Sequence, residues 1–220
     1  GIQLLECQMS MFGTFGNLRS NSSTLAVGGW FWGDLQVDRG FLHILGRAPA
    51  VSALLNNTVF SRKLYTELAT VISTSGSMGF TYAAAADEAW TSVNSDVSML
   101  GGGVFASAVS SFLKMTGGGF FDAQGTWSVV GVSANASGQG LISVLAGAFY
   151  DNASSFVLTN SSDGAGFLAS ESGIITGTGP ATLTGSGVAT SRCISVLDGG
   201  SVKNTGAWTC AAGRVEVNNG

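Results

Sequence analysis

Short apolar runs separated by turn residues fill the C-terminal half of the chain, after Gly125. The runs are rich in Val, Ile, Phe and Thr, and Gly, Asn, Ser or Asp separates them at roughly regular spacing. Runs of this length and composition are typical of β-strands joined by turns. We therefore expect residues 125–220 to form an antiparallel β-sandwich or a β-solenoid-like array. The runs are TWSVVGVSA, GLISVLAGAFY, SFVLTN, GIITG, ATLTG, CISVLDG and RVEV.

The N-terminal half has a mixed pattern. Up to Gly46, aromatic and β-branched residues between glycines predict strands joined by tight turns. From Pro49 to about Thr74, apolar residues recur at helical spacing behind a proline suited to a first helical turn. An alanine run that starts near Tyr82 predicts a second helix, because alanine has the highest helix propensity. The helical spacing over the first segment is carried by Phe60, Leu64, Leu68, Val71 and Ile72.

The fold class expected from these patterns is α+β and β-rich, with helices mainly within residues 48–116. A chain of 220 residues is long enough to bury a core without a metal or a dense set of disulfides. We expect a single domain over residues 1–220. A subdivision into a mixed α/β part, 1–124, and a β-rich part, 125–220, stays open.

Two glycine triplets, Gly101–Gly103 and Gly117–Gly119, stand in the similar segments MLGGGVF and MTGGGFF. Glycine triplets lose much entropy on ordering, so they mark sharp turns, hinges or places where another backbone comes close. The central residues, Gly102 and Gly118, are therefore candidates for a contact between subunits.

Charge is scarce and limits the classes of partner. Charged residues make up 10% of the chain, the formal net charge is −4, and the lysines are scattered. Without a basic stripe, direct binding to nucleic acid is not expected. No run of 18 apolar residues occurs, so we expect no membrane contact. A weakly charged surface rich in Gly, Ser, Thr and Ala favours contact with copies of the same chain.

The residue sets of common catalytic and metal sites are missing from the sequence. The single histidine, His43, lies in an apolar run that predicts a core position, and the chain has no HExxH, CxxC, G-x-S-x-G or P-loop motif. We therefore expect no metal and no cofactor. Carboxylate pairs for a glycosidase are the one hydrolytic alternative, from Asp34 with Asp38 or from Asp87 with Glu88.

The stretch GGWFWGD offers a different function. In an extended strand, Trp30 and Trp32 lie on one face, where two indoles can stack on sugar rings or become buried in a subunit contact. A glycan-binding module that uses these two residues therefore stays open as an alternative.

Cysteines and glycosylation sequons point to the cell exterior. A turn-rich segment separates Cys193 from Cys210, so a hairpin or short loop predicts a disulfide between them, while Cys7 is either a small buried residue or free to pair with another chain. The chain starts at Gly1, which is typical of a processed N-terminus. Five asparagines fit the acceptor pattern for N-linked sugar: Asn21, Asn56, Asn135, Asn152 and Asn160.

These patterns together predict a non-catalytic structural subunit of an ordered extracellular, cell-surface or virion assembly, such as a filament, shell or coat. Its partners would be copies of itself and other subunits of the same particle. The two alternatives are a secreted glycan-binding module and a secreted hydrolase that works through carboxylates.

Overall fold

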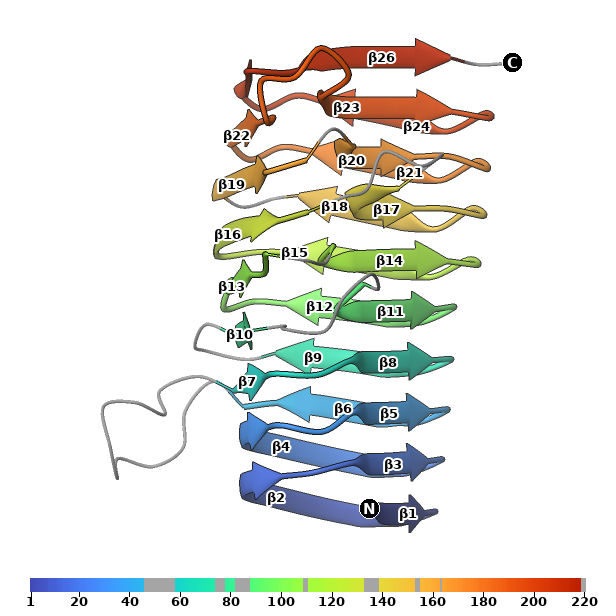
Figure 1. Ribbon diagram of the computed structural model, residues 1–220. Helices are drawn as coiled ribbons and strands as arrows, with labels where there is room; N and C mark the ends of the chain where they lie inside the picture. Colours follow the sequence, from blue (N-terminus) through green and yellow to red (C-terminus); the bar gives the residue numbers. More distant parts are fainter. Residues whose placement is uncertain are drawn as a thin grey trace.

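The computed structural model describes residues 1–45, 58–73, 78–81, 88–108, 111–132, 139–152, 155–162 and 164–218. These residues form strands, turns and bends, and none of them is helical. The strands stack in parallel as successive turns of a β-solenoid, with the two termini at opposite ends of the stack (Figure 1). No helix suited to crossing a membrane occurs in the described part of the chain.

Three faces surround the core. The first face is a ten-stranded parallel sheet. Its strands are β1 (Ile2–Leu5), β3 (Leu18–Asn21), β5 (Leu35–Asp38), β8 (Leu64–Glu67), β11 (Trp90–Val93), β14 (Leu113–Thr116), β17 (Gly140–Val144), β20 (Ala165–Ala169), β23 (Arg192–Leu197) and β26 (Arg214–Asn218).

The second and third faces belong to one sixteen-stranded sheet, because two long strands, β2 (Gln8–Phe15) and β4 (Thr24–Phe31), run along both faces. The second face then continues through β6 (Phe41–Ile44), β9 (Thr70–Ser73), β12 (Asp96–Met99), β15 (Phe120–Ala123), β18 (Phe149–Asn152), β21 (Ile174–Gly177) and β24 (Ser201–Asn204). The third face continues through β7 (Val59–Phe60), β10 (Met78–Thr81), β13 (Gly103–Ala106), β16 (Thr126–Gly131), β19 (Ser155–Asn160), β22 (Ala181–Thr184) and β25 (Trp208–Ala211).

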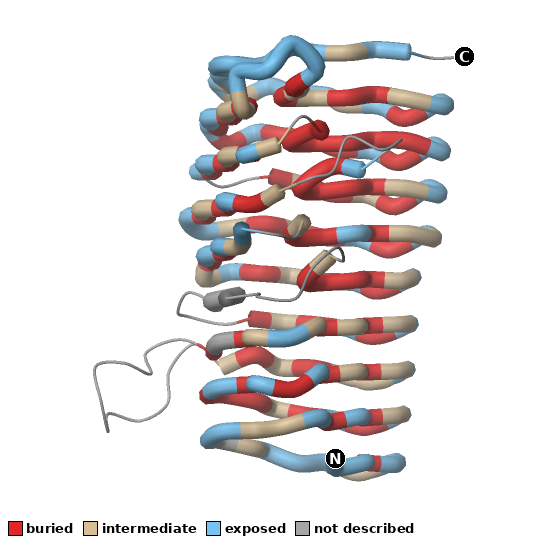
Figure 2. The backbone as a smooth tube through the Cα atoms, in the orientation of Figure 1, coloured by how far each residue is buried: buried red, intermediate tan, exposed pale blue. Residues whose placement is uncertain are grey.

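In most of the short strands, buried positions alternate with exposed or half-exposed ones. In β5, for example, Leu35 and Val37 are buried while Gln36 and Asp38 are half-exposed. Parallel register repeats this choice from turn to turn, since Leu35 pairs with both Leu18 and Leu64. Buried positions therefore form columns along the axis, and Figure 2 shows them in the turns between the two ends, while the first and last turns are largely exposed.

Aromatic rings fill much of the core. Phe15, Phe31 and Phe60 follow one another on successive turns, with ring centroids 4.9 Å and 5.2 Å apart. Further along the axis, Trp127 packs against Phe156 and Phe167 against Trp208 in stacked geometry. Stacked aromatic pairs contribute about 0.5–1.5 kcal/mol each beyond the area they bury, so these contacts stabilise the stacking of one turn on the next.

The corner between the first and second faces uses a left-handed residue in successive turns. A residue with a positive φ lies one or two positions after each first-face strand from β1 to β23, yet most of these residues are not glycine. Leu68 has a φ of 50° and Asn94 a φ of 47°. The column consists of Glu6, Ser22, Arg39, Leu68, Asn94, Gly117, Ala146, Glu171 and Asp198.

The predicted α+β class is wrong, because the described part of the region expected to be helical is made of strands. Leu64 lies in β8, Leu68 in the corner, and Val71 and Ile72 in β9. Two four-residue strands joined by a short corner put Leu64 and Val71 inside at a spacing that one helical face also has. Residues 49–57 and 74, with 82–87 of the second predicted helix, lie outside the described residues.

The β-rich prediction for residues 125–220 is confirmed, and of its two forms the β-solenoid is the one found. The sandwich alternative is wrong because the strands pair in parallel with their equivalents one turn away, as β16 does with β13 and β19. The two glycine triplets also occupy different corners. Gly101–Gly103 leads from β12 into β13, whereas Gly117–Gly119 joins β14 to β15.

Candidate functional site

A row of polar side chains crosses the outer side of the first face in its N-terminal turns. The row arises because outward positions of neighbouring strands are in register, so that Gln36 of β5 lies between Arg19 of β3 and Tyr65 of β8. In order along the axis, the row consists of Gln3, Arg19, Gln36, Tyr65, Thr91 and Lys114.

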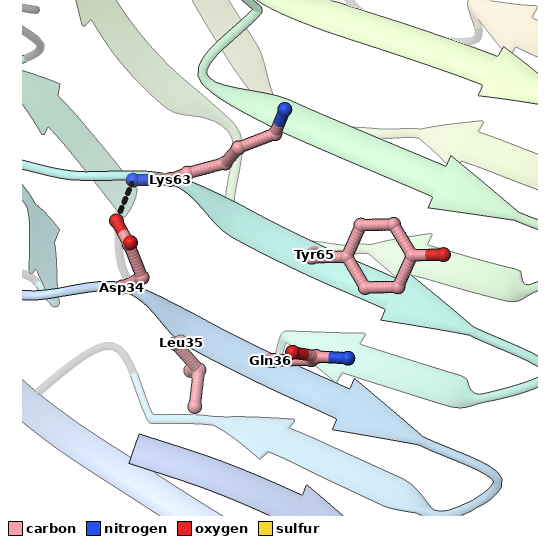
Figure 3. Close-up of a pocket in the computed structure, with 5 residues that line it drawn as sticks. All are labelled: Asp34, Leu35, Gln36, Lys63 and Tyr65. Atoms are coloured by element: carbon pink, nitrogen blue, oxygen red, sulfur yellow. Dashed lines mark hydrogen bonds between the residues drawn. The ribbon is translucent and has the colours of Figure 1, made fainter. Parts of the chain in front are cut away.

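A cavity of about 280 Å³ opens beside the middle of this row (Figure 3). Its walls come from β5 and β8 and from the residues just before these strands. Asp34 links the turn of β5 to the turn of β8, because its carboxylate accepts a hydrogen bond of 3.2 Å from the backbone N–H of Lys63. The cavity is lined by Asp34, Leu35, Gln36, Lys63 and Tyr65.

Two further cavities adjoin the first one toward the N-terminal end. One of about 350 Å³ shares Asp34 and Gln36 with it and extends to Gln3 and Arg19. The next, of about 290 Å³, shares Asn17 with the second and ends at Trp32. We call the three together the trough. It spans β1, β3, β5 and β8, with Trp32 at one end and Tyr65 at the other.

Charges beside the trough are paired. Arg19 lies 3.5 Å from the Asp38 carboxylate, which also accepts a hydrogen bond of 3.3 Å from the Gln36 amide. The Tyr65 hydroxyl donates to Glu67 at 2.8 Å. Burial, that hydrogen bond and the negative charges of Glu67 and Asp38 raise the pKa of Tyr65 to about 12. Tyr65 is therefore a neutral hydrogen-bonding group at physiological pH.

Glu88 forms a second polar cluster further along the first face. It lies 3.5 Å from the Lys63 ammonium and accepts a hydrogen bond of 2.7 Å from the Thr91 hydroxyl. Burial alone raises the pKa of Glu88, but the bonds from Thr91 and its own backbone, together with Lys63 and Lys114, lower it further than burial raises it. The net pKa lies below the usual value, so Glu88 is an anion at neutral pH.

The three described carboxylates considered for hydrolysis, Asp34, Asp38 and Glu88, are each engaged with a cation or a backbone group. Asp34 and Asp38 stand just before β5 and at its end, and Glu88 lies two turns further along the axis. Asp87 lies outside the described residues. Within the described ranges, no three His, Cys, Asp or Glu side chains gather in a way that could hold a metal ion.

His43 is not in the core, which corrects the interpretation of its apolar run. It is half-exposed on the outer side of β6, between the inward Leu42 and Ile44, with its ring edge toward Phe41.

Trp30 and Trp32 lie on the outside with Phe31 buried between them, and they face different surroundings. Trp30 is on the third face, 44% exposed, and its indole N–H donates to the Ser61 hydroxyl at 2.7 Å. Trp32 follows β4 at the corner and is 56% exposed in the trough. The two indoles therefore do not make one shared platform.

Gly102 and Gly118 differ in their surroundings. Gly102 has a φ of +74°, and a Cβ on it would meet the backbone carbonyl of Thr126. This close approach lies between successive turns of one chain. Gly118 is exposed, and a Cβ on it would have no heavy atom within 4 Å.

The Cys193–Cys210 disulfide is confirmed; of the hairpin and the short loop expected to form it, the hairpin is wrong. The buried Cys193 lies in β23 of the first face and the exposed Cys210 in β25 of the third face, so the bond links two faces at the C-terminal end of the solenoid. Cys7 is half-buried and contacts the Ser23 hydroxyl at 3.7 Å.

The sequons divide by accessibility. Asn21 is half-exposed, whereas Asn152 and Asn160 are fully buried and leave no room for a glycan. Asn160 also donates a hydrogen bond of 2.9 Å to the Gly164 carbonyl. Asn56 and Asn135 lie outside the described residues.

The third face has a different character in its C-terminal turns. The strands β13, β16, β19, β22 and β25 contain no charged residue. Their outward positions repeat in register, since Val157 pairs with Ser128 and Thr182. These outward residues are Val104, Ala106, Ser128, Val130, Val157, Thr159, Thr182, Thr184, Thr209 and Ala211.

No protein-family model, curated protein or solved structure matches this chain. Sequence reasoning missed Gln36, Lys63 and Tyr65, because they come together only through the solenoid register. The sequence did hold one signal for this arrangement. The segments LQVD and LYTE have the same alternation of buried and half-exposed positions, which is expected of equivalent strands in neighbouring turns.

Proposed function

We propose that this chain is a non-catalytic structural subunit of an ordered extracellular assembly, in which copies pack side by side through the third face. The observation that carries this proposal is the uncharged outer side of the third-face strands β13, β16, β19, β22 and β25. A parallel β-solenoid is compatible with such a role, because it is a straight, repetitive scaffold whose outer side chains can change without affecting the core.

The charge distribution favours a second copy as the partner on this face. The chain carries a formal net charge of −4, so like-charged copies repel except where a surface has no charge. Val104, Val130 and Val157 are between 41% and 48% exposed there, and rows of Val and Thr can pack against identical rows of a second copy. Desolvating such a surface removes no ionic hydration.

The disulfide supports an extracellular location for the assembly. Disulfides such as Cys193–Cys210 persist in oxidising compartments and are rare in reducing ones. The paired carboxylates on the first face support a non-catalytic role, since Asp38 and Glu88 each have a cationic partner.

The test introduces a charge on the third face. Val157→Lys should reduce the mean molar mass measured by light scattering after size-exclusion chromatography, because a lysine in the packed face must be desolvated. Ile174→Lys is the matched control, since Ile174 is 37% exposed on the second face, which already carries Asp122 and Asp151. A parent that is monomeric at high concentration, or two variants with equal masses, contradicts the proposal.

A further inference from the structure

The trough has features that the proposed packing does not use. Its four strands span about 14 Å from β1 to β8 at the usual spacing of parallel strands, which suits a few linked units of a polymer. It lies on the first face in the N-terminal turns, away from the uncharged part of the third face (Figure 1).

Each end of the trough has an aromatic ring. Trp32 is 56% exposed at one end, and Tyr65 is half-exposed in the wall at the other. Figure 3 shows the Tyr65 ring beside Gln36 along the wall of the cavity. Aromatic side chains present an apolar face together with a polar tip, which suits a ligand with C–H patches and hydroxyls.

Amides lie between the two rings and retain free hydrogen-bonding capacity. Asn17 accepts a hydrogen bond of 3.0 Å from the Asp34 backbone through its carbonyl, which leaves its NH₂ group as a donor. Gln36 donates to Asp38, which leaves its carbonyl as an acceptor. The Gln3 side chain makes no hydrogen bond with another described residue and lines the same cavity.

The charges of the trough favour neither a polyanion nor a polycation. Arg19 is paired with Asp38, and Asp34 and Lys63 contribute one charge of each sign. Apolar ring faces, amides and balanced charge together are the groups that recognise a neutral chain of hydroxyl-bearing rings. We propose that the trough binds a neutral oligosaccharide, with sugar rings packed on Trp32 and Tyr65 and hydroxyls bonded to the amides between them.

The experiment is calorimetric titration of the full chain with neutral hexasaccharides: cellohexaose, maltohexaose, laminarihexaose, mannohexaose and fully N-acetylated chitohexaose. We expect at least one to bind with a Kd of about 1 mM or tighter, a free energy reachable with a few stacked rings. Heparin hexasaccharide and hexagalacturonate, the charged comparators, should bind at least tenfold more weakly. Absence of binding by all the neutral probes at 10-fold higher concentration, about 10 mM, or tighter binding of a charged probe, overturns the proposal.

The two exposed tryptophans give a matched pair of variants. Trp32→Ala should weaken binding tenfold or more, whereas Trp30→Ala, on the third face, should leave Kd unchanged. Tyr65→Phe keeps the ring and should stay within threefold of the parent, while Tyr65→Ala should lose tenfold. Circular dichroism confirms that each variant is folded. Equal losses from Trp30→Ala and Trp32→Ala overturn the assignment to the trough.

This inference and the proposed function fail separately. Val157→Lys changes the third face alone, so it should alter molar mass and leave oligosaccharide affinity unchanged.

Discussion

Replacing Gly102 by alanine tests the way in which successive turns of this solenoid stack. Gly102 has a φ of +74°, and a Cβ there would lie 2.6 Å from the backbone nitrogen of Thr126 and still closer to its carbonyl oxygen. Neither atom can move without disturbing the pairing of Gly103 with Trp127 in the next turn. A left-handed L-residue costs about 1–2 kcal/mol, and forced overpacking about 1–3 kcal/mol. We expect Gly102→Ala to reduce the free energy of unfolding by about 2–5 kcal/mol.

Gly118→Ala is the control within the same chain. Gly118 is exposed, its φ is not positive, and a Cβ would meet nothing within 4 Å. Its backbone N–H bond to the Asn94 side chain is kept by alanine. The substitution should therefore be neutral or stabilise by about 0.4–1 kcal/mol, because alanine lowers the entropy of the unfolded chain.

Urea unfolding followed by circular dichroism and by tryptophan fluorescence measures both variants. With a slope of about 1–3 kcal/mol per molar urea, Gly102→Ala should lower the midpoint by about 1 M or more, while Gly118→Ala leaves it unchanged or higher. The two probes should give the same midpoint for each protein, which is the test that one cooperative transition is measured. Equal midpoints for the two variants would contradict the close contact between Gly102 and the Thr126 backbone of the next turn.

Three further outcomes follow from the geometry. Leu68→Asn should stabilise by about 0.5–1 kcal/mol in urea unfolding, because Leu68 is exposed with a φ of 50° and asparagine tolerates that conformation better; a loss of stability contradicts this. The pKa of Tyr65 is about 12 in the folded chain, above the unfolded value near 10, so its stabilising contribution is complete below pH 10 and is lost as pH rises through 12. Absorbance at 295 nm should show that Tyr65→Phe removes a group that titrates near pH 12, while the buried Tyr150, whose pKa is also raised, remains; a loss of absorbance near pH 10 instead would contradict the raised pKa of Tyr65. Reduction of Cys193–Cys210, which are 17 residues apart, should cost about 3 kcal/mol, and an unchanged melting temperature would contradict this.

The strands of residues 125–220 were predictable because each run is short, β-branched and bounded by turn residues. Their parallel arrangement was not, because alternation along a strand is the same in a sandwich and in a solenoid. The register that decides between the two depends on contacts between residues one turn apart. In this chain the turn length also varies, since Leu18 pairs with Leu35 but Leu35 pairs with Leu64. The sequence therefore has no repeat of fixed length between these turns from which a solenoid could be predicted.

The corners were hidden for a different reason. A left-handed corner usually has glycine or asparagine, but this chain places leucine, arginine and glutamate there, at Leu68, Arg39 and Glu171. Hydrogen bonds to the next turn hold these residues in place, as the Leu68 N–H bond to the Val93 carbonyl shows. Tertiary pairing overrides the local preference at these positions, so turn composition alone misses them.

The candidate site was only partly visible for the same reason as the fold. The sequence singled out Trp32 and Asp34 by residue type, but it grouped Trp32 with Trp30 because they are two residues apart in a strand-like run. The corner after Phe31 separates the two indoles, and the register then brings Trp32 into a line of cavities with Gln36 and Tyr65, which are far from one another in the sequence.

Oligosaccharide binding and side-by-side packing should be independent in this architecture. The trough uses outward positions of β1 to β8 on the first face, whereas the uncharged strip uses those of β13 to β25 on the third face. The two sets share no residue and are separated along the axis as well as around it. Mutational effects at distant sites without shared partners add. A Val157→Lys, Trp32→Ala double variant should therefore show the molar mass of the first substitution and the affinity of the second. A deviation from that sum would mean that packing of copies covers or completes the trough.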